Sequence, residues 1–378
     1  MATRKTRIIC ISDTHNQTPR LPAGDVLIHA GDLTNQGSYS ELEKTVRWLE
    51  GTDFEAKIVI AGNHEITLDA PFHAARAGKF KWSEPQDPAK CRQLLTSSPS
   101  ITYLENSHAK IYLTSPLGPR TCFKVFGSPY SRGQRGWAFQ YWDGGDAEKL
   151  WRGIDADADV VVVHAPAYGH VDKGNANERT GCEVLGRRLG VVRPRMFVCG
   201  HIHGARGVER VRWKERMVDG EDTELVEDVE YWTDPGKGNK KMSLLDLTSK
   251  SGRALENDTG ALPRHEVPYS LRDVFRGADT ESEGPQPDAI SSSLETSALD
   301  DNEALWRRKR GGAVQHSDVG CGEVDAHSEV ASAGSGKAET AMINAAFLGP
   351  RIAGKAMEFN KPIVVDIDLP VWHFAASS

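Results

Sequence analysis

The chain has 378 residues, which allows one large domain with insertions or two domains, and excludes a small scaffold held together by disulfides. Hydrophobic residues make up 39% of the sequence and charged residues 26%, which is the balance of a globular protein with a sizeable core. The formal net charge of −7 has the wrong sign for a protein that coats a phosphate backbone, so we expect no stable binding of nucleic acid.

Neither the N-terminus nor any apolar run predicts a membrane segment. No run approaches the roughly 20 apolar residues of a helix that spans a bilayer. The first six residues, MATRKT, lead directly into a strand-like stretch, without the apolar region of a cleaved signal peptide. The six cysteines form no CxxC pair and several lie in apolar runs, which predicts reduced thiols in a core. Together these features predict a cytoplasmic protein with no membrane contact.

Five short apolar runs predict buried strands at residues 8–12, 26–30, 57–61, 160–163 and 196–199. Between the second and third runs, Ser38 and Glu41 form a capping-box pattern, followed by apolar residues at helical spacing, which predicts a helix. Similar patterns predict strands at residues 109–114, 122–127, 207–213, 241–247 and 362–369, and helices at 147–154 and 182–189. The order strand, helix, strand, with more strands than one parallel sheet usually holds, favours a mixed α/β domain.

The composition changes between residues 249 and 336, where Ser, Gly, Asp, Glu and Ala dominate. Because such a segment buries too little apolar surface to offset its ordering entropy, we expect a disordered insertion here. It would separate a main part at residues 1–248 from a C-terminal part at 337–378 that rejoins the core. For the cluster RRKR at residues 307–310 a solvated run of charge is favoured; the alternative is a weak nuclear-import signal, which would allow a nuclear location.

Each of the five apolar runs ends in side chains that can bind a metal ion. In chain order these are Asp13 and His15, Asp32, Asn63, His164, and His201 and His203. Because the carboxyl ends of strands line the binding crevice of an open α/β sheet, we expect these side chains to converge. Oxygen and nitrogen donors without a thiolate suit Mn, Fe, Zn, Ni or Mg.

Two metal ions about 3.5–4 Å apart can polarise a phosphoryl oxygen and activate water, and such a pair needs a bridging carboxylate. Asp32 is the natural bridge, because Gly31 before it permits a close approach of the backbone. Taken singly, Asp13 and Asp32 are also typical of turns and helix N-caps, and His201 and His203 of an exposed strand end. The five strand ends together favour the two-metal interpretation.

The ordered motifs Asp13-Thr-His15, Gly31-Asp32, Gly62-Asn63-His64-Glu65, His164 and Gly200-His201-Ile-His203 resemble those of the calcineurin-like metallophosphoesterase superfamily. The runs His164-Ala-Pro-Ala-Tyr-Gly169 and Asp172-Lys-Gly174 are similar to the smaller group of metallophosphoesterase-domain-containing proteins, which is associated with phosphodiester hydrolysis. The resemblance covers about residues 7–204, and loosely 342–369, but not the predicted insertion.

This resemblance implies a four-layer αββα sandwich, with two mixed β-sheets flanked by helices. It implies a first metal ion bound by Asp13, His15, Asp32 and His203, and a second bound by Asp32, Asn63, His164 and His201. It also implies in-line attack on phosphorus by a hydroxide that bridges the ions, with His64 near the leaving oxygen. Because histidine titrates near neutral pH, His64 suits a general acid or a cationic hydrogen-bond donor.

The chain departs from the superfamily's protein phosphatases in one respect. Those enzymes usually follow the Gly-Asp motif with Asp-Arg, which helps to bind phosphate, whereas here Asp32 is followed by Leu33 and Thr34. This departure disfavours a phosphoprotein substrate. The resemblance to the smaller group implies hydrolysis of a phosphodiester, and because the sequence shows no basic groove interleaved with aromatic residues for long nucleic acid, we expect a small one. The alternatives are a phosphomonoesterase or protein phosphatase, and a scaffold that keeps the fold without turnover. The scaffold is disfavoured because all seven ligand positions are filled.

Three further features leave two interpretations open. His29 is predicted to pack or to support the ligands, and His170 and Asp172 either contact substrate or have a plain loop role. Four aromatic residues form a cluster for which core packing is favoured over a wall that stacks on bases: Trp137, Phe139, Tyr141 and Trp142.

Overall fold

The computed structural model describes residues 2–133, 136–174, 177–214, 226–257, 338–350, 354 and 356–372. All of these belong to one compact unit, formed by residues 1–267 and 333–378. Of the predicted insertion only residues 249–257 are described. The basic cluster at 307–310 and Cys321 lie outside the described residues. The other five cysteines are buried and free, as predicted.

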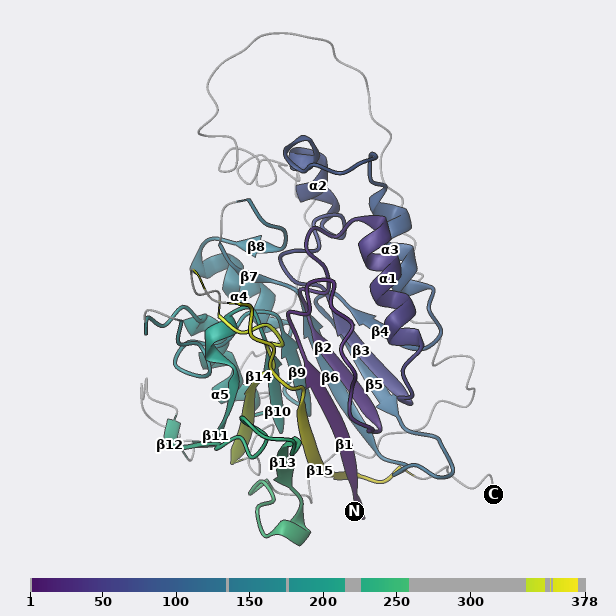
Figure 1. Ribbon diagram of the computed structural model, residues 1–378. Coiled ribbons are helices and arrows are strands. Elements are labelled where there is room, and N and C mark those ends of the chain that lie inside the picture. Colours follow the sequence, from purple (N-terminus) through teal and green to yellow (C-terminus); the bar gives the residue numbers. More distant parts are fainter. Residues whose placement is uncertain are drawn as a thin grey trace, which may run out of the picture. The chain divides into compact units, whose positions relative to one another are not determined.

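Two large sheets form the core (Figure 1). The first has the order β13 (Ser243–Leu247), β15 (Ile363–Pro370), β1 (Thr3–Ile11), β2 (Val26–Ala30), β3 (Ala56–Ile60), β4 (Ile101–Leu104). The second has the order β12 (Val226–Tyr231), β11 (Gly207–Trp213), β14 (Glu339–Asn344), β10 (Met196–Cys199), β9 (Val160–Val163), β6 (Cys122–Ser128), β5 (Ser107–Tyr112). Two short strands, β7 (Ser131–Arg132) and β8 (Gln140–Tyr141), pair with each other.

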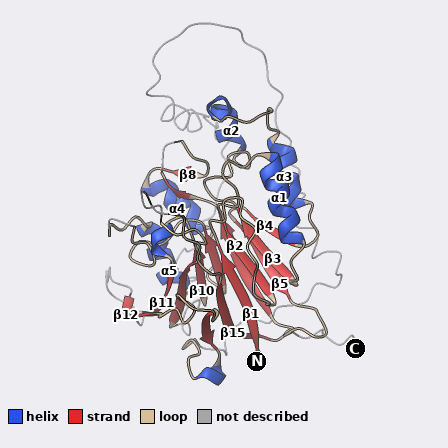
Figure 2. Cartoon of the chain, viewed as in Figure 1, coloured by secondary structure: helices blue, strands red, loops and turns tan. Residues whose placement is uncertain are grey.

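The apolar runs are continuous because both faces of each sheet are covered. In β1, Ile8 and Cys10 belong to the core between the sheets, whereas Ile9 belongs to the core under α1 (Tyr39–Glu50) and α3 (Pro88–Thr96). The outer face of the second sheet is covered by α4 (Gly144–Arg152) and α5 (Glu183–Val192), with Trp151 fully buried between them and the sheet. The helices therefore flank the sheets on both sides, as Figure 2 shows, and the four-layer αββα sandwich is confirmed.

Local signals account for most of these elements. The capping box at Ser38 is present, because Ser38 Oγ accepts from the Glu41 amide and the Glu41 carboxylate accepts from the Ser38 amide. The sequence analysis missed the strands β4, β7, β8 and β12 and the helices α2 (Ala70–Arg76) and α3. Both helices begin after an aspartate N-cap, Asp69 in α2 and Asp87 in α3, and carry proline in the first turn. These two features mark a helix start and could have been recognised in the sequence. Three short 3₁₀ helices complete the structure: η1 (Ala77–Lys79), η2 (His203–Ala205) and η3 (Ser249–Ser251).

Residues on either side of the undescribed segment 258–337 lie next to each other. Asn257 Nδ2 donates to the Glu339 carbonyl at 3.0 Å, and the Glu339 amide donates to Asn257 Oδ1 at 3.0 Å. The Ala338 amide donates to the Glu256 carbonyl at 3.2 Å. The described part of the chain therefore stops at residue 257 and resumes beside it at residue 338. Within the described ranges, no helix has the length and apolar character needed to cross a membrane.

Candidate metal centre

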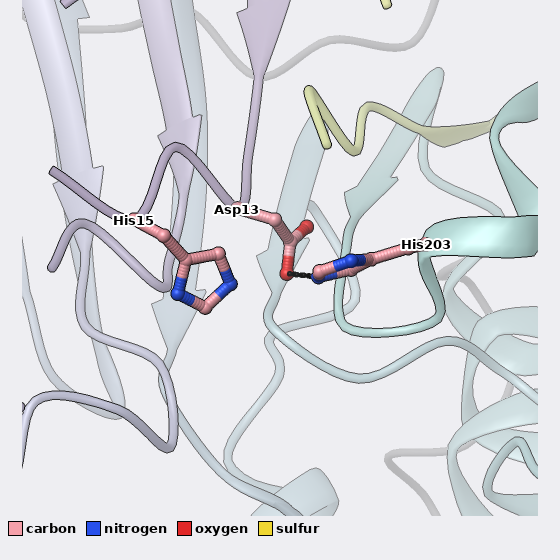
Figure 3. A group of neighbouring side chains, drawn as sticks. All are labelled: Asp13, His15 and His203. Atoms are coloured by element: carbon pink, nitrogen blue, oxygen red, sulfur yellow. Dashed lines mark ion pairs between the residues drawn. The ribbon is translucent and has the colours of Figure 1, made fainter. Parts of the chain in front are cut away.

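The sequence-predicted ligands converge at the carboxyl ends of five strands. Strands β1, β2 and β3 are parallel in the first sheet, and β9 and β10 are parallel in the second. Among the described residues, three groups have possible ligand atoms within 4.8 Å of one another: Asp13, His15 and His203 (Figure 3); His15, Asp32 and His64; and Asp32, His164 and His201. Both sheets thus contribute to one cluster.

Asp32 stands at the centre of this cluster. Its Oδ1 lies 3.3 Å from His164 Nε2, which comes from the second sheet, and its Oδ2 lies 3.6 Å from His15 Nε2, which comes from the first. Asn63 Oδ1 lies 3.1 Å from His164 Nε2. Asp32 is almost fully buried, at 2% exposure. One carboxylate thus presents one oxygen to each half of the site, which is what a bridging ligand requires.

The backbone at the ligands is strained. Asp13, His15, Asp32 and His201 have φ angles of 54°, 42°, 51° and 66°, in the left-handed region that residues other than glycine seldom adopt. Such a conformation costs about 1–3 kcal/mol per residue and persists only where the surrounding structure enforces it. Its concentration at four of the seven candidate ligands indicates a site maintained for function.

The glycines of the three motifs leave room for the ligands. A Cβ atom at Gly31, whose φ is +96°, would lie 2.6 Å from His164 Nδ1. A Cβ at Gly62 would collide with Asp32 Oδ1, and one at Gly200 with the Asp13 carboxylate. Glycine is therefore required at these positions because ligand side chains occupy the space.

Backbone carbonyls set the orientation of two imidazole rings. His15 Nδ1 lies 3.1 Å from the Thr34 carbonyl, and His164 Nδ1 lies 2.9 Å from the Ala30 carbonyl. Because a carbonyl can only accept, each Nδ1 carries a proton, and each Nε2 points toward Asp32. His15 Nε2 is buried and makes no hydrogen bond. A buried, unsatisfied nitrogen beside a carboxylate is a position that a metal ion would satisfy.

Electrostatics keep the carboxylates ionised and two imidazoles neutral. Burial raises the pKa of Asp32, but the charge of His164 and its hydrogen bond to the carboxylate, with a smaller effect of His64, outweigh burial and hold the pKa well below the usual value. Burial lowers the pKa of His15, and it lowers that of His201 to about 4. For His164 burial acts downward, but the Asp32 carboxylate raises the pKa to about 9, so a cation at this ligand would displace a proton. Two carboxylates, one amide and four imidazoles form a donor set that fits divalent ions.

His64 lies beside the ligands and has 23% of its side chain exposed. Its Nδ1 lies 2.7 Å from the Asn35 carbonyl, and its Nε2 lies 3.9 Å from Asp32 Oδ2. The ring of Trp137 packs against the His64 ring, tilted by 32°, with 3.9 Å between centroids. Of the aromatic cluster, Phe139 and Tyr141 are buried in the cores as favoured, and Trp137 is partly buried against a core and also packs against His64, the candidate proton donor. The fourth member, Trp142, is 43% exposed.

Glu65 is a residue of the site to which the sequence analysis gave no role. It is fully buried and accepts from the Gly62 amide at 2.7 Å, and from the Thr34 amide and hydroxyl at 2.8 and 2.9 Å. Burial and the Asp32 charge raise the pKa of Glu65 to about 8. Glu65 ties Thr34, in the loop after Asp32, to Gly62, the residue before Asn63. The loop after Asp32 is where protein phosphatases carry Asp-Arg. Its place in the Gly62-Asn63-His64-Glu65 motif was the available signal.

The remaining candidates have supporting contacts. His29 is buried and its Nε2 lies 3.0 Å from the hydroxyl of Thr14, the residue between two ligands. His170 Nδ1 lies 2.9 Å from a carboxylate oxygen of Glu209. Asp172 is fully buried and pairs with an arginine of its own loop, Arg179, at 2.9 Å. His29 therefore packs and supports the ligand turn, and the other two hold the loop after His164.

Comparison with known proteins places the fold and motifs in a family. Residues 6–205 match the model of the calcineurin-like phosphoesterases. The chain belongs to this family. It is 36% identical over 217 residues to human metallophosphoesterase domain-containing protein 1, with 54% of this chain and 62% of that protein covered; the mouse protein gives the same values. These relatives support the narrower resemblance to the metallophosphoesterase-domain-containing group.

Two other relatives differ in how much of their length is matched. A protein of Emericella nidulans named probable rhamnogalacturonate lyase C is 40% identical over 223 residues, which cover 57% of this chain but 19% of that protein. A Caenorhabditis elegans UPF0046 protein is 31% identical over 213 residues, with 54% of this chain and 71% of that protein covered. The chain thus spans less than two thirds of the Emericella, human and mouse relatives.

Proposed function

We propose that this chain is a metal-dependent phosphodiesterase that uses two divalent ions. Asp13, His15, Asp32 and His203 would bind the first ion, and Asp32, Asn63, His164 and His201 the second. The observation that carries this proposal is Asp32, a buried carboxylate with one oxygen toward a histidine of each sheet. The orphaned His15 Nε2 and the thiolate-free donor set support Mn, Fe, Zn, Ni or Mg as the metal.

When bound, two such ions activate water and polarise the phosphoryl oxygens of an ester. The chain's own contribution is to hold the reacting groups in position. The His201 amide donates one bifurcated hydrogen bond to the Asp13 carboxylate, at 3.0 Å from Oδ1 and 3.1 Å from Oδ2, which fixes the second-sheet turn against the first-sheet ligand. Preorganised ligands of this kind place charge where it develops in the transition state, without reorganisation during the reaction.

His64 is the proposed proton donor to the leaving oxygen. The Asn35 carbonyl fixes a proton on its Nδ1, and the Trp137 ring restricts its rotation, so that Nε2 faces the Asp32 side of the site. A positioned imidazole can transfer a proton from Nε2 to an alkoxide or stabilise that oxygen as a cationic donor. Its partial exposure lets a substrate reach it.

The residues after Asp32 support a small diester over a phosphoprotein. Leu33 is fully buried, and the Thr34 hydroxyl donates a hydrogen bond to Glu65. Neither residue therefore offers the cationic phosphate contact of a protein phosphatase. The lyase name of the Emericella relative describes a protein of which this chain matches a fifth, and it supports no lyase activity here. The cytoplasmic location and the lack of nucleic-acid and membrane binding stay predictions from the sequence.

The test is an assay of the purified full chain with Mn²⁺, Mg²⁺ or Ni²⁺. We expect metal-dependent hydrolysis of bis-p-nitrophenyl phosphate, abolished by EDTA and faster than that of p-nitrophenyl phosphate. A preference for the monoester or for a phosphopeptide would favour the phosphatase alternatives. A folded, metal-loaded protein with no hydrolysis of any of the three substrates would favour a scaffold.

A further inference from the structure

Residues 344–347, which we call the return segment, lie between the ligand-bearing ends of the two sheets. On one side their backbone pairs with Ser12, the residue after β1, because the Ser12 amide donates to the Ala345 carbonyl at 2.9 Å and the Phe347 amide donates to the Ser12 carbonyl at 2.8 Å. On the other side, the Ala345 amide donates to the Cys199 carbonyl at 2.8 Å. The return segment thus joins the residue before Asp13 to the strand that leads to His201.

The side chain of Asn344 extends this contact to the ligand turn itself. It is fully buried, and its Nδ2 lies 3.3 Å from the Gly200 carbonyl and 3.1 Å from the Ile202 carbonyl, the residues on either side of His201. The same Nδ2 lies 3.2 Å from the Val171 carbonyl, in the loop after His164. Oδ1 accepts from the Ala346 amide at 3.1 Å, so both ends of the amide are engaged.

These contacts explain how the turn at His201 keeps its strained conformation. Three carbonyl dipoles converge on one point, and a buried carbonyl without a donor costs about 1–3 kcal/mol. The two amide protons of Asn344 supply that donor. With the Asp13 carboxylate bound to the His201 amide, the turn is held from two directions while His201 has a φ of 66°. Loss of the Asn344 donor would let the three carbonyls move apart. His201, which lies between Gly200 and Ile202, and His203, which follows Ile202, would be displaced with them.

We propose that Asn344 is a positioning residue for the candidate ligands His201 and His203. The metal centre is then completed by a residue on the far side of segment 258–337, outside the family match, which ends at residue 205. The inference rests on the proposed function, because it takes the two histidines as ligands. Partners that orient ligands typically contribute about 10-fold to 100-fold to metal affinity.

The test compares Asn344→Ala and Asn344→Ser with Asn360→Ala in the full chain. Asn360 is a matched control, because its Nδ2 donates to the Ala346 carbonyl at 3.1 Å and holds the return segment without touching the ligand turn. Mn²⁺ affinity is measured by calorimetry and site geometry by the Co²⁺ absorption spectrum, below the unfolding temperature of each variant. We expect Mn²⁺ to bind 10-fold to 100-fold more weakly in Asn344→Ala, with an altered Co²⁺ spectrum. The change should be smaller in Asn344→Ser, which keeps one donor, and under twofold in Asn360→Ala.

Two outcomes separate the inference from the function on which it rests. If wild-type chain binds Mn²⁺ and a folded Asn344 variant binds it within twofold with an unchanged Co²⁺ spectrum, Asn344 has no positioning role and the proposed function stands. If wild-type chain binds neither ion, the proposed function is wrong and the inference fails with it. Should Asn344→Ala not fold, Asn344→Ser decides the question by the same criteria.

Discussion

Two buried carboxylates of this chain have opposite surroundings. Glu339, at the start of β14, forms ion pairs with two arginines, Arg210 at 2.5 Å and Arg212 at 3.0 Å. Asp32 is faced by His15, His64 and His164, and no arginine or lysine is paired with it in the described part of the chain. The first arrangement is a completed ion pair, whereas the second becomes complete with an added cation.

The backbone shows the same contrast. None of the residues that contact the Glu339 side chain has a positive φ, whereas Asp32 and three other candidate ligands do. Ordinary packing tolerates buried charge when the charge is paired, and it has no need of strain. Strain and incompletely paired charge coincide at the carboxyl ends of the strands, which distinguishes a site for chemistry from a structural ion pair.

The largest expected effect is that of Asp32→Ala. Because Asp32 would serve both ions, its loss leaves each ion under-ligated and removes the charge that offsets their repulsion. We expect turnover of bis-p-nitrophenyl phosphate to be abolished and bound metal to fall at both sites, as measured by elemental analysis. His203→Ala, the control, should mainly empty one site. Two ions per chain with near-normal turnover in Asp32→Ala would refute the bridging role.

Next in size is His64→Ala, which should keep its metal ions and lose on the order of 10² to 10⁴ in turnover, the usual contribution of a positioned proton donor. The loss should shrink for good leaving groups, which need no protonation. Rates for p-nitrophenyl and alkyl diesters measure this difference. An equal loss for both would replace leaving-group protonation by electrostatic stabilisation as the role of His64.

Glu339→Gln should affect stability and leave the metal centre unchanged. Breaking a fully buried ion pair costs about 3–5 kcal/mol, and we expect a smaller loss here because the side chains of Arg210 and Arg212 are 18% and 42% exposed and water can solvate them. Arg210 and Arg212 overcome the effect of burial and hold the pKa of Glu339 below its usual 4.5. The contribution of Glu339 to stability is therefore full above about pH 4.5 and lost as the pH falls further. Urea unfolding at pH 7 and pH 4 should show the Gln variant closer to wild type at pH 4; equal differences at both would contradict this.

The smallest expected effect is that of replacing segment 258–337 by a short Gly/Ser linker. Because Asn257 and Glu339 are already joined, the linker has a short gap to close, and closure entropy depends on loop length only logarithmically. We expect the melting temperature to stay within a few degrees and the hydrolysis of a small diester to be preserved. A shortened chain that precipitates, or that keeps its metal ions and loses activity, would show that the segment contributes to the unit or its site.

How far the sequence predicted the structure depends on whether the signal was local. The five strands and the seven ligand candidates were predictable, because each ligand directly follows an apolar run and because the motif glycines mark close approach. Glu65 was visible in a motif, but its contacts with Thr34 arise only in the folded state. Asn344 carries no local signal, and Trp137 was visible only as a member of an aromatic cluster; the contacts of both could not be predicted because the partner of each lies more than 70 residues away in the sequence.

The most direct measurement of the central claim, that Asp32 joins two metal ions, is a Mn²⁺ titration of the full chain followed by electron paramagnetic resonance. We expect two ions to bind per chain and to give the exchange-coupled signal of a bridged pair, which Asp32→Ala abolishes. One ion per chain, or two ions with the signal of isolated Mn²⁺, would contradict the proposal that Asp32 bridges a pair of metal ions.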